Sequence, residues 1–169
     1  MSNDADDIRI HTLSVYVANK PGVLARIAQV FARRGYNIDS LVVSPSMDGR
    51  YSRMTIAAKG SIEGLEQIIK QVGKLVDIQH CSDHSFEQSV VREMALVKIR
   101  ASTDERTEAL QICEHFGGKT VDLTATSMIV LVVGASEKVD ACINMLSAFE
   151  IVELVRTGKV VMARGDDVT

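Results

Sequence analysis

Apolar and polar residues alternate near the start of the chain and then recur at helical spacing. Between residues 11 and 18, Leu13, Val15 and Val17 alternate with mostly polar neighbours, which is typical of a half-buried strand. Apolar side chains then repeat at the spacing of a helix over residues 23–31. The pattern therefore predicts a strand followed directly by an amphipathic helix that packs on it.

The turn and end signals complete a first set of six elements. Asn19 suits the N-cap of the first helix, and Gly35 supplies its end. Asp48-Gly49 is a strong hairpin signal between two further strands, and Ser61 is typical of the cap of a second helix. The remaining elements are a strand over 38–44, a strand over 51–59, a helix over 61–73 and a strand over 76–80. The predicted order is β-α-β-β-α-β.

The second half of the chain repeats this order. Gly117 and Gly118 end its first helix, as Gly35 does in the first half, and Ser136 is expected to cap its second helix. The predicted elements are a strand over 96–100, a helix over 103–116, strands over 120–125 and 128–133, a helix over 136–146, a strand over 151–156 and a last segment over 160–163. The likeness is one of pattern more than of identity.

A β-α-β-β-α-β unit forms a four-stranded antiparallel sheet with both helices on one face, the ferredoxin-like layout. The sequence therefore predicts an α+β protein with two tandem ferredoxin-like βαββαβ domains. We place them at residues 1–80 and 94–169, and we interpret the polar stretch 81–93 as a linker. A unit of about 75 residues is marginally stable alone, so pairing with a partner is expected.

Composition narrows the class of protein. The chain has 169 residues, 46% of them hydrophobic and 24% charged, which is typical of a soluble globular protein. A net charge of −3 and an aromatic content of 4% without Trp argue against a nucleic-acid partner. The acidic N-terminus and the lack of a long apolar run argue against a signal peptide and a membrane span. Three widely spaced cysteines favour a reducing compartment, so we expect a cytoplasmic protein.

The sequence offers no recognisable catalytic or metal-binding motif. His80, Cys81 and His84 are the strongest candidate for a metal cluster, but they have no second ligand pair at zinc-like spacing, and solvated side chains are the simpler interpretation. Gly118 and Lys119 resemble part of a phosphate-binding loop, yet they end a helix where such a loop begins one. We therefore expect no catalytic residues and no metal site in this chain.

The turn between the first strand and the first helix has parts that suit an amino acid. Backbone N–H groups around Gly22 can receive a carboxylate, and Asn19 and Asn37 can hydrogen bond to a carboxylate or an ammonium group. Neighbouring aliphatic side chains can surround an apolar ligand. The competing interpretation is structural, with Asn19 as an N-cap and Asn37 as a turn residue. The candidate ligand-binding residues are Asn19, Gly22, Val23, Leu24, Asn37 and Ile38.

Five stretches carry a family resemblance. They are NKPGVLARIAQVFARRGYNIDSLVV (19–43), SRMTI (52–56), EQIIKQVGKLVDI (66–78), REMALVKI (92–99) and the closing V-x-x-ARGD (160–166). Together they resemble the small regulatory subunits of acetolactate synthase (acetohydroxyacid synthase). The first stretch alone resembles the wider class of ACT domains, which are small-molecule sensor modules.

The resemblance implies a non-catalytic subunit that binds the large catalytic subunit, activates it and makes it sensitive to feedback by valine. It implies that residues 1–80 form an ACT domain, that these domains pair so that two sheets join, and that valine binds at the dimer interface. The family's first ligand asparagine falls on Asn19, its glycine on Gly22, and the asparagine supplied across the dimer on Asn37. Thiamine diphosphate, Mg²⁺ and FAD belong to the large partner, so no cofactor is expected in this chain.

Many family members have Glu-Ser or Glu-Pro where this chain has Lys20-Pro21, which puts a positive charge beside the site.

The alternative function is a free-standing ACT-type sensor that controls another enzyme or a transcription factor. An enzyme in its own right would need catalytic groups that the sequence does not show. Arg53 and Thr55 are candidates for a docking surface, because they are expected to share the strand face opposite Met54 and Ile56; the competing interpretation is an ordinary polar strand face.

Overall fold

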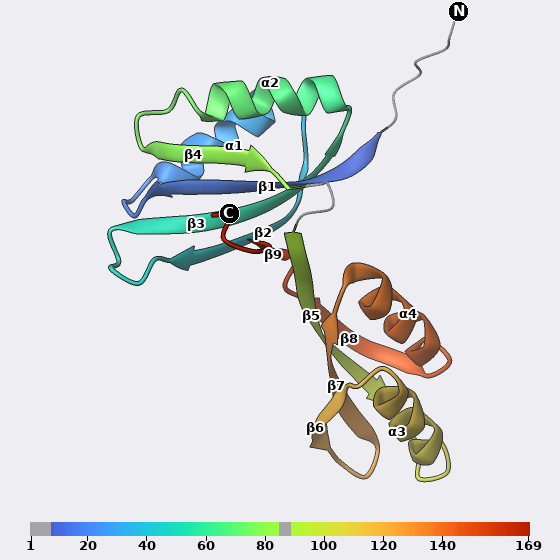
Figure 1. The fold of residues 1–169 in the computed structure, drawn as a ribbon. Helices are drawn as coiled ribbons and strands as arrows, with labels where there is room; N and C mark the ends of the chain where they lie inside the picture. The colour runs from blue at the N-terminus through green and yellow to red at the C-terminus, as the bar shows by residue number, and fades with distance from the viewer. Residues whose placement is uncertain (1–7, 85–88) are drawn as a thin grey trace, which may run out of the picture. The chain divides into compact units, whose positions relative to one another are not determined.

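The computed structural model describes residues 8–84 and 89–169 and divides the chain into two compact units. The first unit holds the chain up to Val90 together with Gly158–Thr169, and the second holds Val91–Thr157. Figure 1 shows the elements of each unit. The two are described separately.

The first unit is a four-stranded antiparallel sheet in the order β2-β3-β1-β4 (Figure 1). Its elements are β1 (Arg9–Ala18), α1 (Val23–Arg33), β2 (Ile38–Pro45), β3 (Tyr51–Gly60), α2 (Ile62–Val72) and β4 (Ile78–Asp83). Leu13, Val15 and Val17 form its core together with Ile27 and Phe31 of α1, and all five are at most 1% exposed. The alternation seen in the sequence is thus the alternation between a core face and an outer face.

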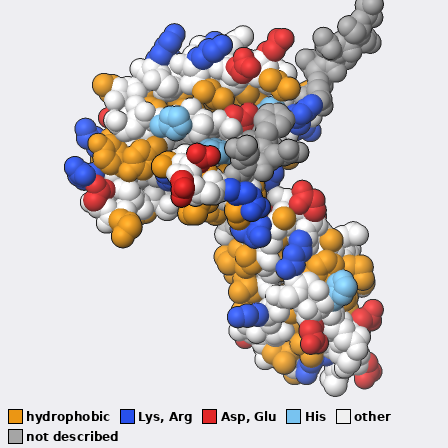
Figure 2. All heavy atoms as spheres, in the orientation of Figure 1, with side chains coloured by type: hydrophobic (Ala, Val, Ile, Leu, Met, Phe, Trp, Pro, Cys, Tyr) orange, Lys and Arg blue, Asp and Glu red, His pale blue; other side chains and the backbone are white. Residues whose placement is uncertain are grey.

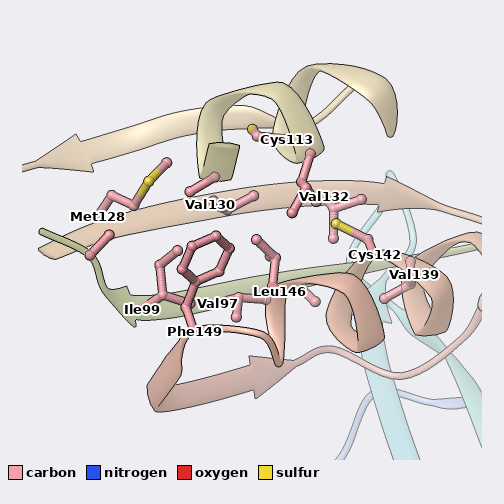
Figure 3. Close-up of a cluster of buried hydrophobic side chains, with 14 residues drawn as sticks. Val97, Ile99, Cys113, Met128, Val130, Val132, Val139, Cys142, Leu146 and Phe149 are labelled. Carbon is pink, nitrogen blue, oxygen red and sulfur yellow. The ribbon is translucent and has the colours of Figure 1, made fainter. Parts of the chain in front are cut away.

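The second unit repeats the layout, with the sheet order β6-β7-β5-β8. Its elements are β5 (Ser89–Arg100), α3 (Arg106–His115), β6 (Lys119–Leu123), β7 (Ser127–Gly134), α4 (Ser136–Leu146) and β8 (Glu150–Arg156), and β9 (Val160–Ala163) also pairs with β5. Val97 and Val130 from the sheet meet Cys142 and Leu146 from α4 in its core (Figure 3). The predicted pair of βαββαβ units is therefore confirmed.

The outer sheet face of the second unit has an apolar part, beside the ion pair between Lys98 and Glu153. Leu96 on β5 pairs with Leu131 on β7 and with Val155 on β8, and all three lie on the face opposite the core. Val155 is 53% exposed, and Val133 on the same face is 48% exposed. Figure 2 shows hydrophobic side chains at the surface of this unit.

The structure corrects two of the predicted boundaries. The predicted linker over 81–93 is mostly strand, because β4 continues to Asp83 and β5 begins at Ser89; residues 85–88 lie outside the described part. The sequence did not predict these strand residues because they are polar. β4 lies at a sheet edge, where polar side chains reach water, and Glu93 in β5 is buried but bonds to Arg156 and Ser136. The predicted second domain over 94–169 ends too late, since Gly158–Thr169 groups with the first unit.

Helix starts follow the predicted caps in one case and not in the other. Ser61 accepts a hydrogen bond from the amide of Gly64 at 3.3 Å, as expected of an N-cap. Ser136 is instead the first residue of α4, and its hydroxyl donates to Glu93. Among the described residues, no helix is long and apolar enough to cross a membrane.

Candidate functional site

The turn between β1 and α1 has a left-handed glycine at its helix end. Gly22 has φ 82°, which favours glycine, and it occupies the N-cap position without a side-chain cap. The amide of Arg26 donates to the carbonyl of Gly22 at 3.1 Å, so the helix starts here. The amide of Val23 donates to the carbonyl of Lys20 at 3.5 Å, and the next N–H groups of the first turn have no partner within the helix, so this end presents donors to an anion. The structure thus places Gly22 at the start of α1, and a binding notch at this position stays a prediction.

Asn19 joins this turn to the hairpin between β2 and β3, so the prediction that it caps α1 is wrong. Its side-chain Nδ2 donates to the carbonyl of Gly49 at 3.0 Å, and its main-chain N donates to the carbonyl of Arg50 at 2.9 Å. The left-handed Gly22 delays the helix, which leaves Asn19 three residues ahead of the cap. An amide nitrogen carries two hydrogens, so one of them remains for a ligand at this exposed position.

The hairpin that receives Asn19 is held by its own polar bonds. Ser46 Oγ donates to Asp48 Oδ1 at 2.7 Å, and Arg50 Nε donates to Asp48 Oδ2 at 2.6 Å. The hydrogen bond from Ser46 and those from Arg50 lower the pKa of the Asp48 carboxyl to about 2. Asp48 is therefore ionised at neutral pH and keeps the carbonyl of Gly49 in place for Asn19.

Arg26 and Asp77 lie beside the notch, and sequence reasoning assigned them no role there. Arg26 pairs with Asp77, and its Nη1 is 3.6 Å from the position that a Cβ on Gly22 would occupy. The carbonyl of Asp77 also accepts the amide of Ala18 at 2.8 Å. The position of Arg26 four residues after Gly22 could have placed its side chain near the turn. Its pairing with Asp77 has no signal in the sequence, because Asp77 is 51 residues away. The notch therefore has a guanidinium at its edge.

The predicted aliphatic residues do not share one environment. Val23 is 2% exposed and belongs to the core, while Ile38 is half-buried and packs against that core. Leu24, which is 38% exposed, is the one of the three that offers apolar surface next to Gly22.

Asn37 lies at the opposite end of the unit from Asn19. Ala18, just before Asn19, pairs with Tyr51 at the start of β3, whereas Ile38, just after Asn37, pairs with Ala58 near the end of β3. Helix α1 runs between the two ends over 11 residues, which corresponds to about 16 Å. Within one chain the structure brings Asn19 and Gly22 together and leaves Asn37 apart.

The equivalent turn of the second unit is closed by a side chain. Arg106, the first residue of α3, donates through Nη2 to the carbonyls of Thr124 at 3.0 Å and Ala125 at 2.7 Å. These carbonyls lie between β6 and β7, as the Gly49 carbonyl lies between β2 and β3. Both units therefore tie the first turn to the hairpin, but the second unit does so with a guanidinium from the helix start.

The residues considered for a metal do not form a cluster. Burial raises the pKa of the Cys81 thiol to about 11, so this half-buried cysteine is a poor metal ligand. His84 Nε2 lies 2.9 Å from Ser82 Oγ, and His80 is exposed on β4. Within 8–84 and 89–169, no group of three or more His, Cys, Asp or Glu is placed to hold a metal ion.

The comparisons with known proteins cover both units. Residues 13–80 match the family described as "AHAS small subunit-like ACT domain", and residues 92–165 match "Small subunit of acetolactate synthase". The probable acetolactate synthase small subunit of Archaeoglobus fulgidus is 43% identical over 156 residues, which is 92% of this chain and 98% of that relative. The acetolactate synthase small subunit of Mycolicibacterium smegmatis is 39% identical over 155 residues, covering 92% of this chain and 91% of the relative.

A solved structure agrees with the sequence relatives. The crystal structure of the acetolactate synthase small subunit from Thermotoga maritima superposes with a TM-score of 0.84 at 41% identity, over 95% of this chain and 100% of that one. Identity at this level across nearly the whole length, with both units matched, establishes the family. This chain belongs to the acetolactate synthase small-subunit family.

Proposed function

We propose that this chain is the non-catalytic regulatory subunit of acetolactate synthase. It binds the large catalytic subunit, raises its activity and makes it sensitive to feedback inhibition by valine. Thiamine diphosphate, Mg²⁺ and FAD are held by the large subunit. The proposal is supported by the family and by the notch at Gly22.

The position of β2 is the observation that best supports a valine site shared between two copies of the chain. This strand lies at the edge of the first sheet, next to β3 only. It has no lysine, and its proline, Pro45, is at the very end, so its free edge has few of the features that block pairing. An edge of this kind pairs readily with a second copy of itself.

Such pairing would complete the site. In a two-fold symmetric dimer, the two β2 strands run antiparallel, so the start of one lies beside the end of the other. Asn37 precedes the start of β2, and the hairpin after its end carries Gly49, to which Asn19 is bound. Asn37 of one copy therefore comes next to Asn19 and Gly22 of the other.

The proposed valine chemistry follows from these groups. The carboxylate accepts hydrogen bonds from the N–H groups at the start of α1, with Arg26 adding positive charge at the edge. The side-chain carbonyls of the two asparagines accept bonds from the ammonium group, and Leu24 contacts the aliphatic side chain. Valine inhibits only if it binds one state of the complex more tightly than the other.

The test uses the large subunit reconstituted with Asn19→Ala or Asn37→Ala chains. Each change is expected to raise the valine concentration for half-inhibition about tenfold, because each removes hydrogen bonds to a charged ligand worth at least about 1.4 kcal/mol. Activation without valine is expected to stay normal. Asn144→Ala, at an exposed position of α4, is the matched control. Unchanged valine sensitivity in either variant would remove that asparagine from the site.

A further inference from the structure

The centre of the outer face of the first sheet is buried although it is polar. Leu13 and Val15 of β1 point into the core, so Thr12, Ser14 and Tyr16 lie on the opposite face. Thr12 is 4% and Ser14 2% exposed. A polar outer face of an antiparallel sheet is normally open to water. Another part of the chain must therefore lie over these strands.

The part that lies there includes Gly158–Thr169, which we call the closing segment. Gly158 has φ 82°, and a Cβ on it would be 2.5 Å from Cβ of Ser40 on β2. At the other end, the Arg53 guanidinium on β3 donates to the main-chain carbonyl of Thr169. Val161, between them, is 3% exposed. The closing segment thus crosses the outer face from β2 to β3.

The closing segment is held by pairing of β9 with β5 and by Thr169, which is 9% exposed, while one side chain beside Thr169 projects outward. The amide of Ala163 donates to Thr169 Oγ1 at 2.6 Å, so this stretch folds back on itself. Val168 is 86% exposed, and a hollow of roughly 460 Å³ remains between Val168, Thr169 and the side chains of Tyr16, Arg53 and His80. Figure 2 shows acidic side chains where the chain ends, over the strands of the first sheet.

The surface beneath the closing segment combines cations with aromatic rings. Arg53 lies over the ring of Tyr16 with its Cζ 5.4 Å from the centroid, and Tyr16 stacks on Tyr51 at 5.1 Å. Arg50 lies over Tyr51 at 5.9 Å, although its guanidinium is also paired with Asp48. Arginine and tyrosine are the residues that most often anchor protein partners. With His80 at its edge, this surface is suited to an extended segment that carries carboxylates.

We propose that this outer face, centred on Arg53 and Tyr16, docks an extended acidic segment of the large catalytic subunit, and that the closing segment covers the face in the free chain. The inference rests on the proposed function, because it takes the large subunit as the partner. In the free chain Thr169 provides the oxygen that Arg53 binds. In the complex a carboxylate of the partner takes that place, and the closing segment moves away.

The proposal predicts opposite effects at the two ends of the closing segment. Arg53→Gln removes the cation that receives the partner, so half-saturation by the large subunit is expected to need about tenfold more of this chain, with a weaker dependence on salt. Gly158→Ala strains a left-handed position and clashes with Ser40, which loosens the cover. Half-saturation is then expected at about fivefold lower concentration.

Each variant has a matched control. Arg33→Gln removes an exposed arginine from the end of α1, away from the outer face, and Gly117→Ala imposes the same kind of backbone strain in the second unit. Both are expected to bind as the wild type does. If the wild-type chain fails to bind the large subunit, the proposed function itself is wrong. If it binds and Arg53→Gln binds equally well, or Gly158→Ala gains nothing, the docking proposal is wrong.

Hydrogen exchange on the unmodified chain gives a test that does not depend on variants. On addition of the large subunit, amides of the closing segment, including that of Ala163, are expected to exchange faster. The outer-face strands β1 and β3 are expected to keep their protection. Slower exchange in the closing segment would show that it stays on the face in the complex, and this would overturn the proposal.

Discussion

The two units have the same fold and close the same turn in different ways. In the first, the amide of Asn19 reaches the hairpin carbonyl of Gly49, and the helix begins at a glycine without a side chain. In the second, Arg106 reaches two hairpin carbonyls from the first turn of its helix. A guanidinium fills space and adds charge where the first unit leaves backbone donors accessible. One fold thus supports a candidate ligand site in one copy and a filled turn in the other.

Their outer sheet faces differ as well. The first unit has Thr12, Ser14 and Arg53 on that face and covers it with the closing segment. The outer face of the second has an apolar part that includes Leu96, Leu131 and Val155. The two units therefore share the order of elements and the position of the core, while the first turn and the outer face differ.

The largest expected effect is that of a side chain at Gly22. Gly22→Val places a branched residue at φ 82°, with its Cβ 3.6 Å from Arg26 Nη1 and its methyl groups in the notch. We expect valine binding to be lost in calorimetric titration, with a cost of about 1–2 kcal/mol in the free energy of unfolding. Gly117→Val is the counterpart in the second unit, since Gly117 has φ 59° and Lys138 Nζ at 3.7 Å. It is expected to cost similar stability and to leave valine affinity unchanged; equal loss of binding in both would contradict a site confined to the first unit.

A smaller effect is expected at Arg106. Arg106→Ala breaks two hydrogen bonds to the carbonyls of Thr124 and Ala125, and it should lower the free energy of unfolding by about 1 kcal/mol, since the side chain is partly exposed. Arg106→Lys should recover part of this loss in urea denaturation. Neither variant is expected to bind more valine than the wild type, because the emptied turn of the second unit has no counterpart of Asn19 and Gly22. Additional valine bound by Arg106→Ala would show that the arginine merely blocks a second site.

The smallest effect is expected at the hairpin under Asn19. Asp48 has a pKa of about 2 against an ordinary value of 3.8, so its stabilising contribution is present above the ordinary value and is lost as the pH falls through about 2. Asp48→Asn should therefore lower Tm slightly at neutral pH, and the difference should vanish near pH 2. Asp39→Asn, at an exposed position of β2, serves as the control in thermal unfolding. A difference that grows toward acid pH would rule out this role for Asp48.

The features that could be predicted from the sequence are those set by local pattern, such as strand alternation and helix ends. Leu13, Val15 and Val17 alternate because every second residue of a strand faces the core, and Gly35 ends α1 with φ 72°. The edge strand β4 and the central strand β5 were harder to delimit, because the polar residues of β4 and the buried Glu93 in β5 do not follow the apolar pattern. The order of helices and strands can therefore be predicted from the sequence, whereas the ends of the strands can be predicted only in part.

The site was predictable as a set of residues but not as a geometry. Asn19 and Gly22 were found from turn chemistry, yet the bond from Asn19 to Gly49 spans 30 residues and has no local signal. The pairing of Arg26 with Asp77 and of Arg53 with Thr169 spans still longer separations. Contacts of this kind depend on how the strands are ordered, and they become visible only once the sheet is assembled.

The central claim is that the valine site is shared between two copies of the chain. It is tested by mixing Asn19→Ala and Asn37→Ala chains, refolding them together and titrating the mixture with valine by calorimetry. In a mixed dimer, one site receives Asn37 from the first chain and Asn19 from the second and is therefore intact. We predict that high-affinity valine binding, absent from each variant alone, returns in the mixture at about a quarter of the wild-type number of sites. If the mixture binds no better than the separate variants, the two asparagines do not form a site across a dimer.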